Sequence, residues 1–136
     1  MAQGYGSGSN RTTDPDEIVN LYKATYSEGT GYTNLTDASG SDYTVPVGKK
    51  FILSYFSGWD NLSSSSSSQM DLYKQAGDGT QTLIYPKFGG PGSSEASNTW
   101  AYNVTITIAA GFKIQWKNNQ SNRGGTGFFS GLEVTA

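Results

Sequence analysis

Residues 43–56 of this chain are YTVPVGKKFILSYF, and they predict an edge segment, a corner and a strand that enters a core. Pro46 fixes its own φ angle and donates no backbone hydrogen bond, so a sheet ladder cannot continue through it. Gly48 allows a tight turn that most residues would resist, and the two lysines after it keep the corner in solvent. From Phe51 onward, aromatic and β-branched residues predict a strand.

The composition of the chain indicates its fold class. Its 136 residues are enough for one domain with a single core and too few for two. The 18 glycines, with many Ser, Thr and Asn residues, favour a turn-rich β protein. Segments rich in Ala, Leu, Glu and Lys, which would build long helices, are missing.

The composition also argues against several functions. A formal net charge of -2 does not match the basic surface of a nucleic-acid-binding protein, so we expect no nucleic-acid partner. The chain has no histidine and no cysteine, which rules out His-based acid–base catalysis, the usual nucleophile triads, thiolate chemistry and disulfides. We therefore expect a protein that is not an enzyme and uses no metal or cofactor. The first residues resemble neither a signal peptide nor a transmembrane span, so we expect no usual export route and no membrane partner.

Residues 1–16 are expected to form a flexible N-terminal arm, and residues 17–136 the folded domain. The arm is rich in Gly, Ser and other polar residues, and Tyr5 and Arg11 are its candidates for contacting a partner. It cannot bury enough apolar surface to offset its ordering entropy, so only a partner would order it.

The border between arm and domain allows two interpretations. Residues 14–17, Asp-Pro-Asp-Glu, resemble a helix start, with Asp as the cap and Pro at the first helical position. Residues 19–26 fit a strand about as well, and we favour the strand because nothing helical follows for a helix to pack on. The carboxylates Asp14, Asp16 and Glu17 could hold Ca²⁺, but capping or solvation is the preferred interpretation at this border.

Short strands separated by polar turns are expected in the remaining chain. The dipeptide Asp78-Gly79, between two runs of β-forming residues, is a strong hairpin signal. Residues 100–108 alternate between apolar and small or polar side chains, which predicts a half-buried antiparallel strand. In the closing strand, Leu132 and Val134 are expected to face inward. The expected strands are 19–26, 32–36, 51–56, 70–76, 81–86, 100–108, 112–116 and 128–135, with loops at 58–61, 63–68, 88–97 and 118–127.

About eight short strands, with turns roughly every 8–12 residues, are typical of a sandwich or barrel. The expected fold class is all-β, an antiparallel jelly-roll sandwich of two packed sheets.

Two separated stretches carry a resemblance to a known family. Residues 43–53, YTVPVGKKFIL, and residues 104–116, VTITIAAGFKIQW, resemble a small phage jelly-roll family, as does the closing FSGLEV at 129–134. Members of this family typically have "VPAGK" leading into one strand and "aGd-I" leading into another. This chain departs from that pattern with Val47 in place of the usual alanine and Phe112 in place of a polar residue.

The resemblance implies a structural role in a virus particle. Domains of this family occur as capsid decoration (cement) proteins and as modules of tail spikes and fibres, commonly as trimers. It therefore implies a homotrimer on the capsid surface of a virion, with the major capsid protein as its second partner.

A second hypothesis comes from the aromatic residues. Trp59 is expected in a polar loop beside Asp60 and Asn61, where its ring could either stack on a sugar or belong to the core. Trp100 and Trp116 lie in phase with aliphatic residues, which favours a core or subunit-interface position. The alternative function is therefore a glycan-binding module, either the receptor-binding part of a phage tail fibre or a carbohydrate-binding module, with host surface glycans as partners.

Two function classes thus remain open from the sequence, a cement protein and a glycan-binding module, because jelly rolls serve both roles. A hydrolase without histidine would need two inward carboxylates, and the expected strands offer almost none. Arg123 is a basic loop tip, expected in solvent rather than on RNA. The candidate partner-binding residues are Tyr5, Arg11, Trp59 and Arg123.

Overall fold

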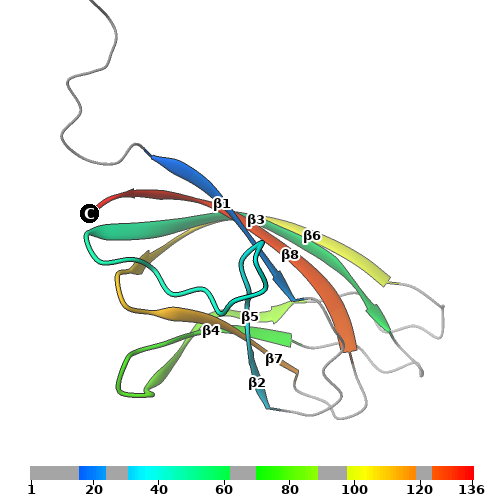
Figure 1. Cartoon of the computed structure of the whole chain (residues 1–136). Helices are drawn as coiled ribbons and strands as arrows, with labels where there is room; N and C mark the ends of the chain where they lie inside the picture. Colours follow the sequence, from blue (N-terminus) through cyan, green and yellow to red (C-terminus); the bar gives the residue numbers. More distant parts are fainter. Residues whose placement is uncertain (1–15, 24–30, 62–69, 89–97, 119–123) are drawn as a thin grey trace, which may run out of the picture.

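The computed structural model describes residues 16–23, 31–61, 70–88, 98–118 and 124–136. Eight β-strands and no helix occupy these residues (Figure 1). No helix in this described part is long and apolar enough to cross a membrane. The strands are β1 (Glu17–Lys23), β2 (Tyr32–Asn34), β3 (Lys49–Asn61), β4 (Met70–Gln75), β5 (Gln81–Phe88), β6 (Asn98–Ala109), β7 (Lys113–Asn118) and β8 (Gly124–Thr135).

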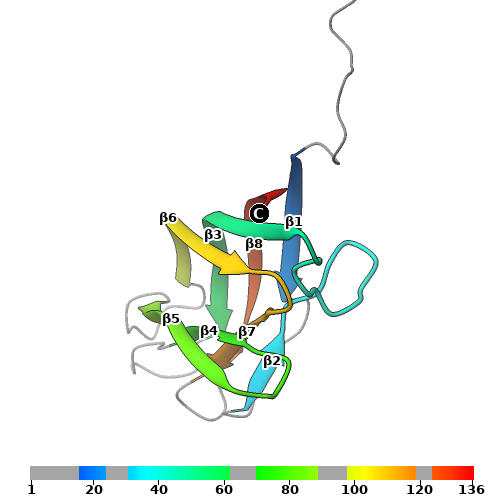
Figure 2. The same ribbon diagram turned by 90° about the vertical axis from the view of Figure 1, so that its left-hand side faces the viewer.

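The strands form two four-stranded antiparallel sheets that face each other across the core (Figures 1 and 2). Sheet A has the order β1-β8-β3-β6, and sheet B has the order β2-β7-β4-β5. The chain changes sheet after every strand except β4, which is joined to β5 by a hairpin. This strand order is that of a jelly roll, which confirms the predicted fold class.

The predicted corner at residues 43–48 is confirmed. Gly48 adopts a φ angle of 80°, in the left-handed region that glycine tolerates best. Before the corner, Val45 is buried and its amide donates to the carbonyl of Phe112 at 3.0 Å. Val47 lies at the tip of the turn and is 95% exposed. Strand β3 begins directly after this corner and pairs with both β6 and β8, so it lies inside sheet A.

The core lies between the sheets and is rich in aromatic rings. Phe56 of β3 stacks on Phe129 of β8 with centroids 5.3 Å apart and meets Phe88 of β5 edge-on at 5.2 Å. All three side chains are fully buried, and burying each contributes about 1.5–3 kcal/mol. In β6, residues 100, 102, 104, 106 and 108 face this core while 101, 103, 105 and 107 are exposed, as the alternation predicted.

The facing of β8 is opposite to the prediction. Leu132 was expected to point inward but is 36% exposed, whereas Phe129, Gly131 and Glu133 are buried. Gly131 lies directly under a core ring, because a Cβ atom there would lie 2.5 Å from Cζ of Phe51. Since a shift of one residue would turn every side chain to the other face, these inward positions determine the register of the whole strand.

Several strands are longer than their residues suggested. Residues 58–61, predicted as a loop, belong to β3, because the ladders to β6 and β8 continue along both of its sides. The ring of Trp100 packs over Gly58 and leaves no room for a Cβ atom, so glycine fits at this position of the longer strand. The predicted loop at 118–127 is likewise shorter, since Asn118 ends β7 and Gly124 begins β8.

Two further predictions of secondary structure are confirmed, and others concern residues that the structure does not describe. Strand β1 (Glu17–Lys23) confirms the preference for a strand over a helix at the start of the domain. The hairpin at Asp78-Gly79 is confirmed: Gly79 has a φ angle of 92°, and the amide of Thr80 donates to Asp78 Oδ1 at 2.9 Å. Phe88 was assigned to the loop at 88–97 but is the last residue of β5 and is fully buried, because it packs in the core. The rest of that loop, the serine run at 63–68 and the predicted arm at 1–16 up to residue 15 lie outside the described residues.

Candidate functional site

Of the four predicted partner-binding residues, only Trp59 lies in the part of the chain that the structure describes. Tyr5, Arg11 and Arg123 lie outside the described residues. Trp59 lies on β3 and not in a loop, which corrects the prediction. It pairs with Thr99 of β6 and Thr126 of β8, and its side chain is 36% exposed.

The other two tryptophans belong to the core, as predicted. Trp116 is fully buried and Trp100 is 6% exposed, with ring centroids 5.7 Å apart. The indole nitrogen of Trp116 donates to Asn118 Oδ1 at 2.8 Å, so its polar group is satisfied inside the protein. Neither ring can therefore serve as a platform for a sugar.

An apolar row crosses the outer face of sheet A. It consists of Ile18 of β1, Leu132 of β8 and Ile52 of β3, which are direct cross-strand partners. Ile18 is 73% exposed and Leu132 is 36% exposed, while Ile52 is half-buried. Such a row on adjacent strands is a continuous apolar surface rather than a set of scattered side chains.

On the same face, further cross-strand pairs lie on either side of the apolar row. Tyr22 and Phe128 are cross-strand partners with ring centroids 5.6 Å apart. Between them and the apolar row, Ser130 donates to the side-chain oxygen of Asn20 at 2.8 Å. Beyond the row, Lys50 pairs with Val134 at the end of the sheet. The apolar row is therefore bordered by a polar pair on one side and by Val134 and the charged Lys50 on the other, and polar groups commonly surround the centre of a protein–protein interface.

This apolar row was missed from the sequence because Leu132 was assigned to the inner face. The signal that could have found it is Gly127-Phe128-Phe129-Ser130-Gly131, in which two glycines share a face with Phe129. A Cβ atom at Gly127 would lie 2.6 Å from the ring of Trp116, so both glycines mark the face that large rings cover.

A buried tyrosine–carboxylate pair joins β8 to the segment before the corner. The hydroxyl of Tyr43 donates to Glu133 Oε2 at 2.8 Å, and these residues are 6% and 8% exposed. Burial raises the pKa of Tyr43 well above its usual range, and the hydrogen bond to the Glu133 carboxylate raises it further. Within the described residues, no group of three or more His, Cys, Asp or Glu side chains could hold a metal ion.

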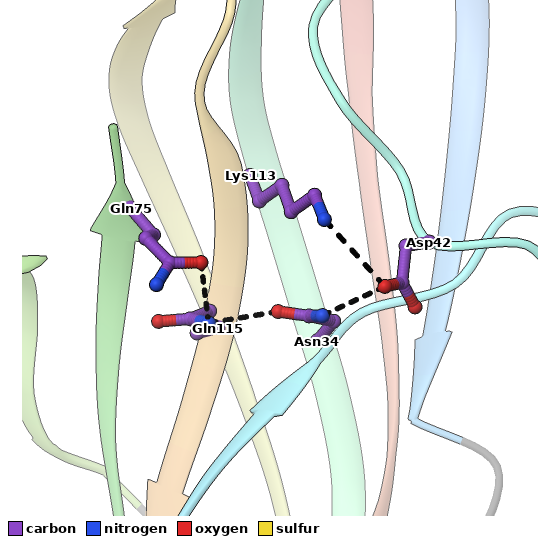
Figure 3. Close-up of polar contacts among 5 residues, drawn as sticks. All are labelled: Asn34, Asp42, Gln75, Lys113 and Gln115. Carbon is purple, nitrogen blue, oxygen red and sulfur yellow. Dashed lines mark hydrogen bonds and ion pairs between the residues drawn. The ribbon is translucent and has the colours of Figure 1, made fainter. Parts of the chain in front are cut away.

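The outer face of sheet B carries an amide ladder, formed by Asn34, Gln75, Gln81 and Gln115. Figure 3 shows three of these residues, Asn34, Gln75 and Gln115. Gln115 is its centre and is only 5% exposed. Its Nε2 group donates to Asn34 at 2.8 Å and to Gln75 at 3.1 Å, and its Oε1 accepts from Gln81 at 2.8 Å. The ladder thus joins all four strands of sheet B.

The ladder continues into a charged pair at its edge. Asn34 Nδ2 donates to Asp42 Oδ2 at 2.7 Å, and Lys113 Nζ lies 3.7 Å from the same oxygen (Figure 3). The polar groups of the Gln115 side chain are hydrogen-bonded within the ladder. The role of Gln115 is therefore to stabilise the sheet rather than to bind a ligand.

Beside the ladder lies an aromatic pair that the sequence analysis did not single out. Tyr32 of β2 and Tyr73 of β4 meet edge-to-face with centroids 5.0 Å apart, and Lys117 Nζ lies 5.8 Å from the Tyr32 ring centroid. Burial raises the pKa of Tyr73, with smaller contributions from Tyr32 and Asp71. Tyr32 is 41% exposed, so part of this ring is open to contact from outside.

Comparison with known proteins finds solved structures at low sequence identity. No family model matches the chain, and no curated protein matches it either. One similar structure is a pentameric capsid protein from metagenomic phage sequences, with 11% identity and a TM-score of 0.39 over 87% of this chain. This chain spans 61% of the length of that capsid protein. Another is the globular domain of zebrafish complement 1qA, with 13% identity and a TM-score of 0.40 over 84% of this chain and 94% of that domain.

Proposed function

We propose that this chain is a non-enzymatic virion structural protein, a decoration protein that binds the outer capsid surface as a homotrimer and stabilises the capsid. Its partners are two further copies of itself and the major capsid protein, and its location is the capsid surface. The observation that carries this proposal is the apolar row of Ile18, Leu132 and Ile52 on the outer face of sheet A.

The exposure of the apolar row favours an assembly role. Isoleucine is among the residues most often fully buried, yet Ile18 is 73% exposed on a regular strand. Covering the apolar row with a partner would remove it from water, which contributes roughly 25 cal/mol for each Å² of apolar surface buried. The polar groups around the row then supply orientation and specificity.

The buried polar groups favour a binding protein over an enzyme. Glu133 is the one buried carboxylate among the described residues, and Tyr43 already occupies one of its oxygens. Glycoside hydrolysis usually needs two carboxylates a few ångströms apart, one of them a proton donor. The arrangement at Glu133 instead serves to position β8.

The mass of the native assembly tests the proposal directly. Native mass spectrometry of the chain should give three times 14.5 kDa. The double variant Ile18→Asp/Leu132→Asp should remain folded by circular dichroism but lose the trimer, because two charges would enter the apolar row. Leu83→Asp is the matched control, since Leu83 is 45% exposed on sheet B, away from the row. A wild-type monomer at micromolar concentration would contradict the trimer.

The capsid location needs an independent test. Gold-labelled antibodies raised against the chain should decorate the heads of intact particles in electron micrographs. Labelling confined to tails would contradict the capsid location and favour a tail-fibre module.

A glycan-binding function remains the second candidate because exposed aromatic rings lie on both sheets. Trp59 on sheet A and Tyr32 on sheet B are 36% and 41% exposed. Aromatic rings with this exposure can stack on the apolar faces of sugars. Under our proposal a glycan array probed with the wild-type chain gives no specific signal; a specific signal lost in Trp59→Ala or Tyr32→Ala would favour this second function.

A further inference from the structure

The two sheets have four edge strands, and three of them carry features that prevent pairing with another chain. Strand β2 is only three residues long. Strand β5 contains Pro86, and Lys87 follows it with a φ angle of 53°, while the register with β4 shifts twice. Strand β1 is charged at both ends, by Glu17 and Lys23. Short length, proline, irregular backbone and charge are the usual protections of a sheet edge.

Strand β6 is long and lacks charge and proline, and its one irregularity is a register shift in its pairing with β3, between Leu53 and Tyr55. Its 12 residues, NTWAYNVTITIA, include no charged residue, no proline and no glycine. At about 3.4 Å per residue the strand is about 40 Å long. Its outward side chains, such as Ala101, Asn103 and Thr105, are exposed, small and uncharged, so another strand could approach closely.

The sandwich is closed on one side only. Where sheets A and B meet at β1 and β2, Tyr22 and Thr36 exchange two backbone hydrogen bonds of 2.8 and 2.9 Å, which use part of the β1 edge. At the opposite side, where β6 lies beside β5, the described residues form no such bridge. Figure 2 shows β6 as the last strand of sheet A on that side. Among described strands β6 therefore pairs with β3 alone.

We propose that β6 is an assembly edge, where it pairs antiparallel with β6 of a second copy so that sheet A continues across a two-fold axis. A second copy fits because it presents an equally long strand without charge or proline. The other edges of a copy do not fit as well, since each is short, interrupted or partly used. With no charged residue in β6, the two-fold axis places no like charges opposite each other.

Pairing of this kind supplies main-chain hydrogen bonds. In an antiparallel pair, every second residue directs its N–H and C=O groups to the new neighbour. Two paired 12-residue strands therefore gain on the order of ten hydrogen bonds, the same principle by which extended peptides add to sheet edges.

The inference does not require the proposed trimer. If the trimer forms through the apolar row, the β6 edge links trimers to one another through two-fold axes. A molecule with both a three-fold and a two-fold contact can cover a surface as a connected net, which suits a decoration protein. If the trimer does not form, the same edge makes a dimer.

A charge introduced on the exposed face of β6 tests the pairing. Thr105→Lys should lower the mass seen by light scattering at high protein concentration to that of the unit without the β6 contact, a trimer if the trimer forms and a monomer if it does not. Thr82→Lys is the matched control, because Thr82 is also an exposed threonine on an edge strand, β5, but that edge is already interrupted. Equal masses for wild type and Thr105→Lys across the micromolar range would overturn the proposal.

Disulfide trapping gives a second measurement that does not depend on the lysine variant. The chain has no cysteine, so single cysteines at Ala101, Asn103, Thr105 and Thr107 each supply the only thiol. Antiparallel two-fold pairing brings one of these positions opposite its own copy, or two neighbouring ones opposite each other, with Cβ atoms about 4.5–5.5 Å apart. One single variant, or one mixture of two neighbouring variants, should therefore form far more interchain disulfide than the others. Equally low yields in every single variant and every such mixture would contradict the β6 pair.

Discussion

The hydroxyl of Tyr43 donates a 2.8 Å hydrogen bond to Glu133, which lies 90 residues later in the chain. This bond ties the segment before the corner to β8, the strand between β1 and β3. Because Glu133 faces inward, its neighbour Leu132 must face outward, and the apolar row of sheet A follows from that facing. A buried polar contact on one face of a strand thus accounts for an apolar surface on the other.

Removing the hydroxyl of Tyr43 should destabilise the fold. In Tyr43→Phe the Glu133 carboxylate stays buried without this donor, so we expect the free energy of unfolding to fall by about 1.5–3 kcal/mol. Urea denaturation measures the change. Tyr32→Phe is the control, because Tyr32 is 41% exposed and should change stability by less than about 0.5 kcal/mol. Equal stability of Tyr43→Phe and the wild type would show that the bond contributes nothing.

The same pair predicts a dependence of stability on alkaline pH. Burial, with the Glu133 carboxylate, raises the folded-state pKa of Tyr43 above its unfolded value of about 10. The contribution of this group is therefore complete below about pH 10 and is lost as the pH rises above it, because the unfolded chain then releases the proton. Above about pH 10 the free energy of unfolding should fall more steeply in the wild type than in Tyr43→Phe. Parallel slopes would argue against the raised pKa.

The glycines on the inner face of β8 should tolerate no side chain. In Gly131→Ala the new Cβ atom would lie 2.5 Å from the ring of Phe51, and we expect a loss of about 1–3 kcal/mol in unfolding free energy. Gly77→Ala is the matched control, because nothing lies within 4 Å of its added Cβ. That variant should be neutral or more stable by about 0.4–1 kcal/mol, since alanine restricts the unfolded chain. Thermal or urea unfolding of both proteins gives the comparison, and similar losses in the two would be unexpected.

The amide ladder should depend mainly on its central residue. Gln115→Ala removes three hydrogen bonds at a position that is 5% exposed, so we expect a loss of about 1–3 kcal/mol. Gln81→Ala removes only one of these bonds and should cost less than about 1 kcal/mol. Hydrogen exchange should show faster opening of sheet B in the first variant and not in the second. Equal losses of unfolding free energy in the two variants would show that Gln115 stabilises the ladder no more than Gln81 does.

Replacing Trp59 should distinguish the two function classes. Under the decoration-protein proposal, Trp59→Ala keeps the fold by circular dichroism and shows no glycan binding, like the wild type. Trp59 lies on the same sheet as the apolar row, so the variant is also expected to weaken capsid attachment or leave it unchanged. Strong binding of the wild type to one sugar, abolished in Trp59→Ala, would instead support the glycan-binding function.

Local chemistry in the sequence was enough to predict most of the fold. The alternation in residues 100–108 predicted which face of β6 is buried, because a strand has a period of two wherever it lies. The corner before β3 and the hairpin at Asp78-Gly79 were predicted for a similar reason. Proline and glycine restrict or free the φ angle of their own residue, whatever the rest of the molecule does.

Only the tertiary structure decided the facing of β8 and the position of Trp59. Residues 128–134, FFSGLEV, place large apolar side chains on both faces of a strand, so their pattern alone fits either facing. The choice comes from distant partners: the ring of Phe51 needs the space at Gly131, and the hydroxyl of Tyr43 needs the carboxylate of Glu133. Trp59 similarly belongs to a strand because β6 and β8 pair with it on both sides. Contacts between residues far apart in the chain leave no local pattern, so packing and hydrogen bonding had to decide them.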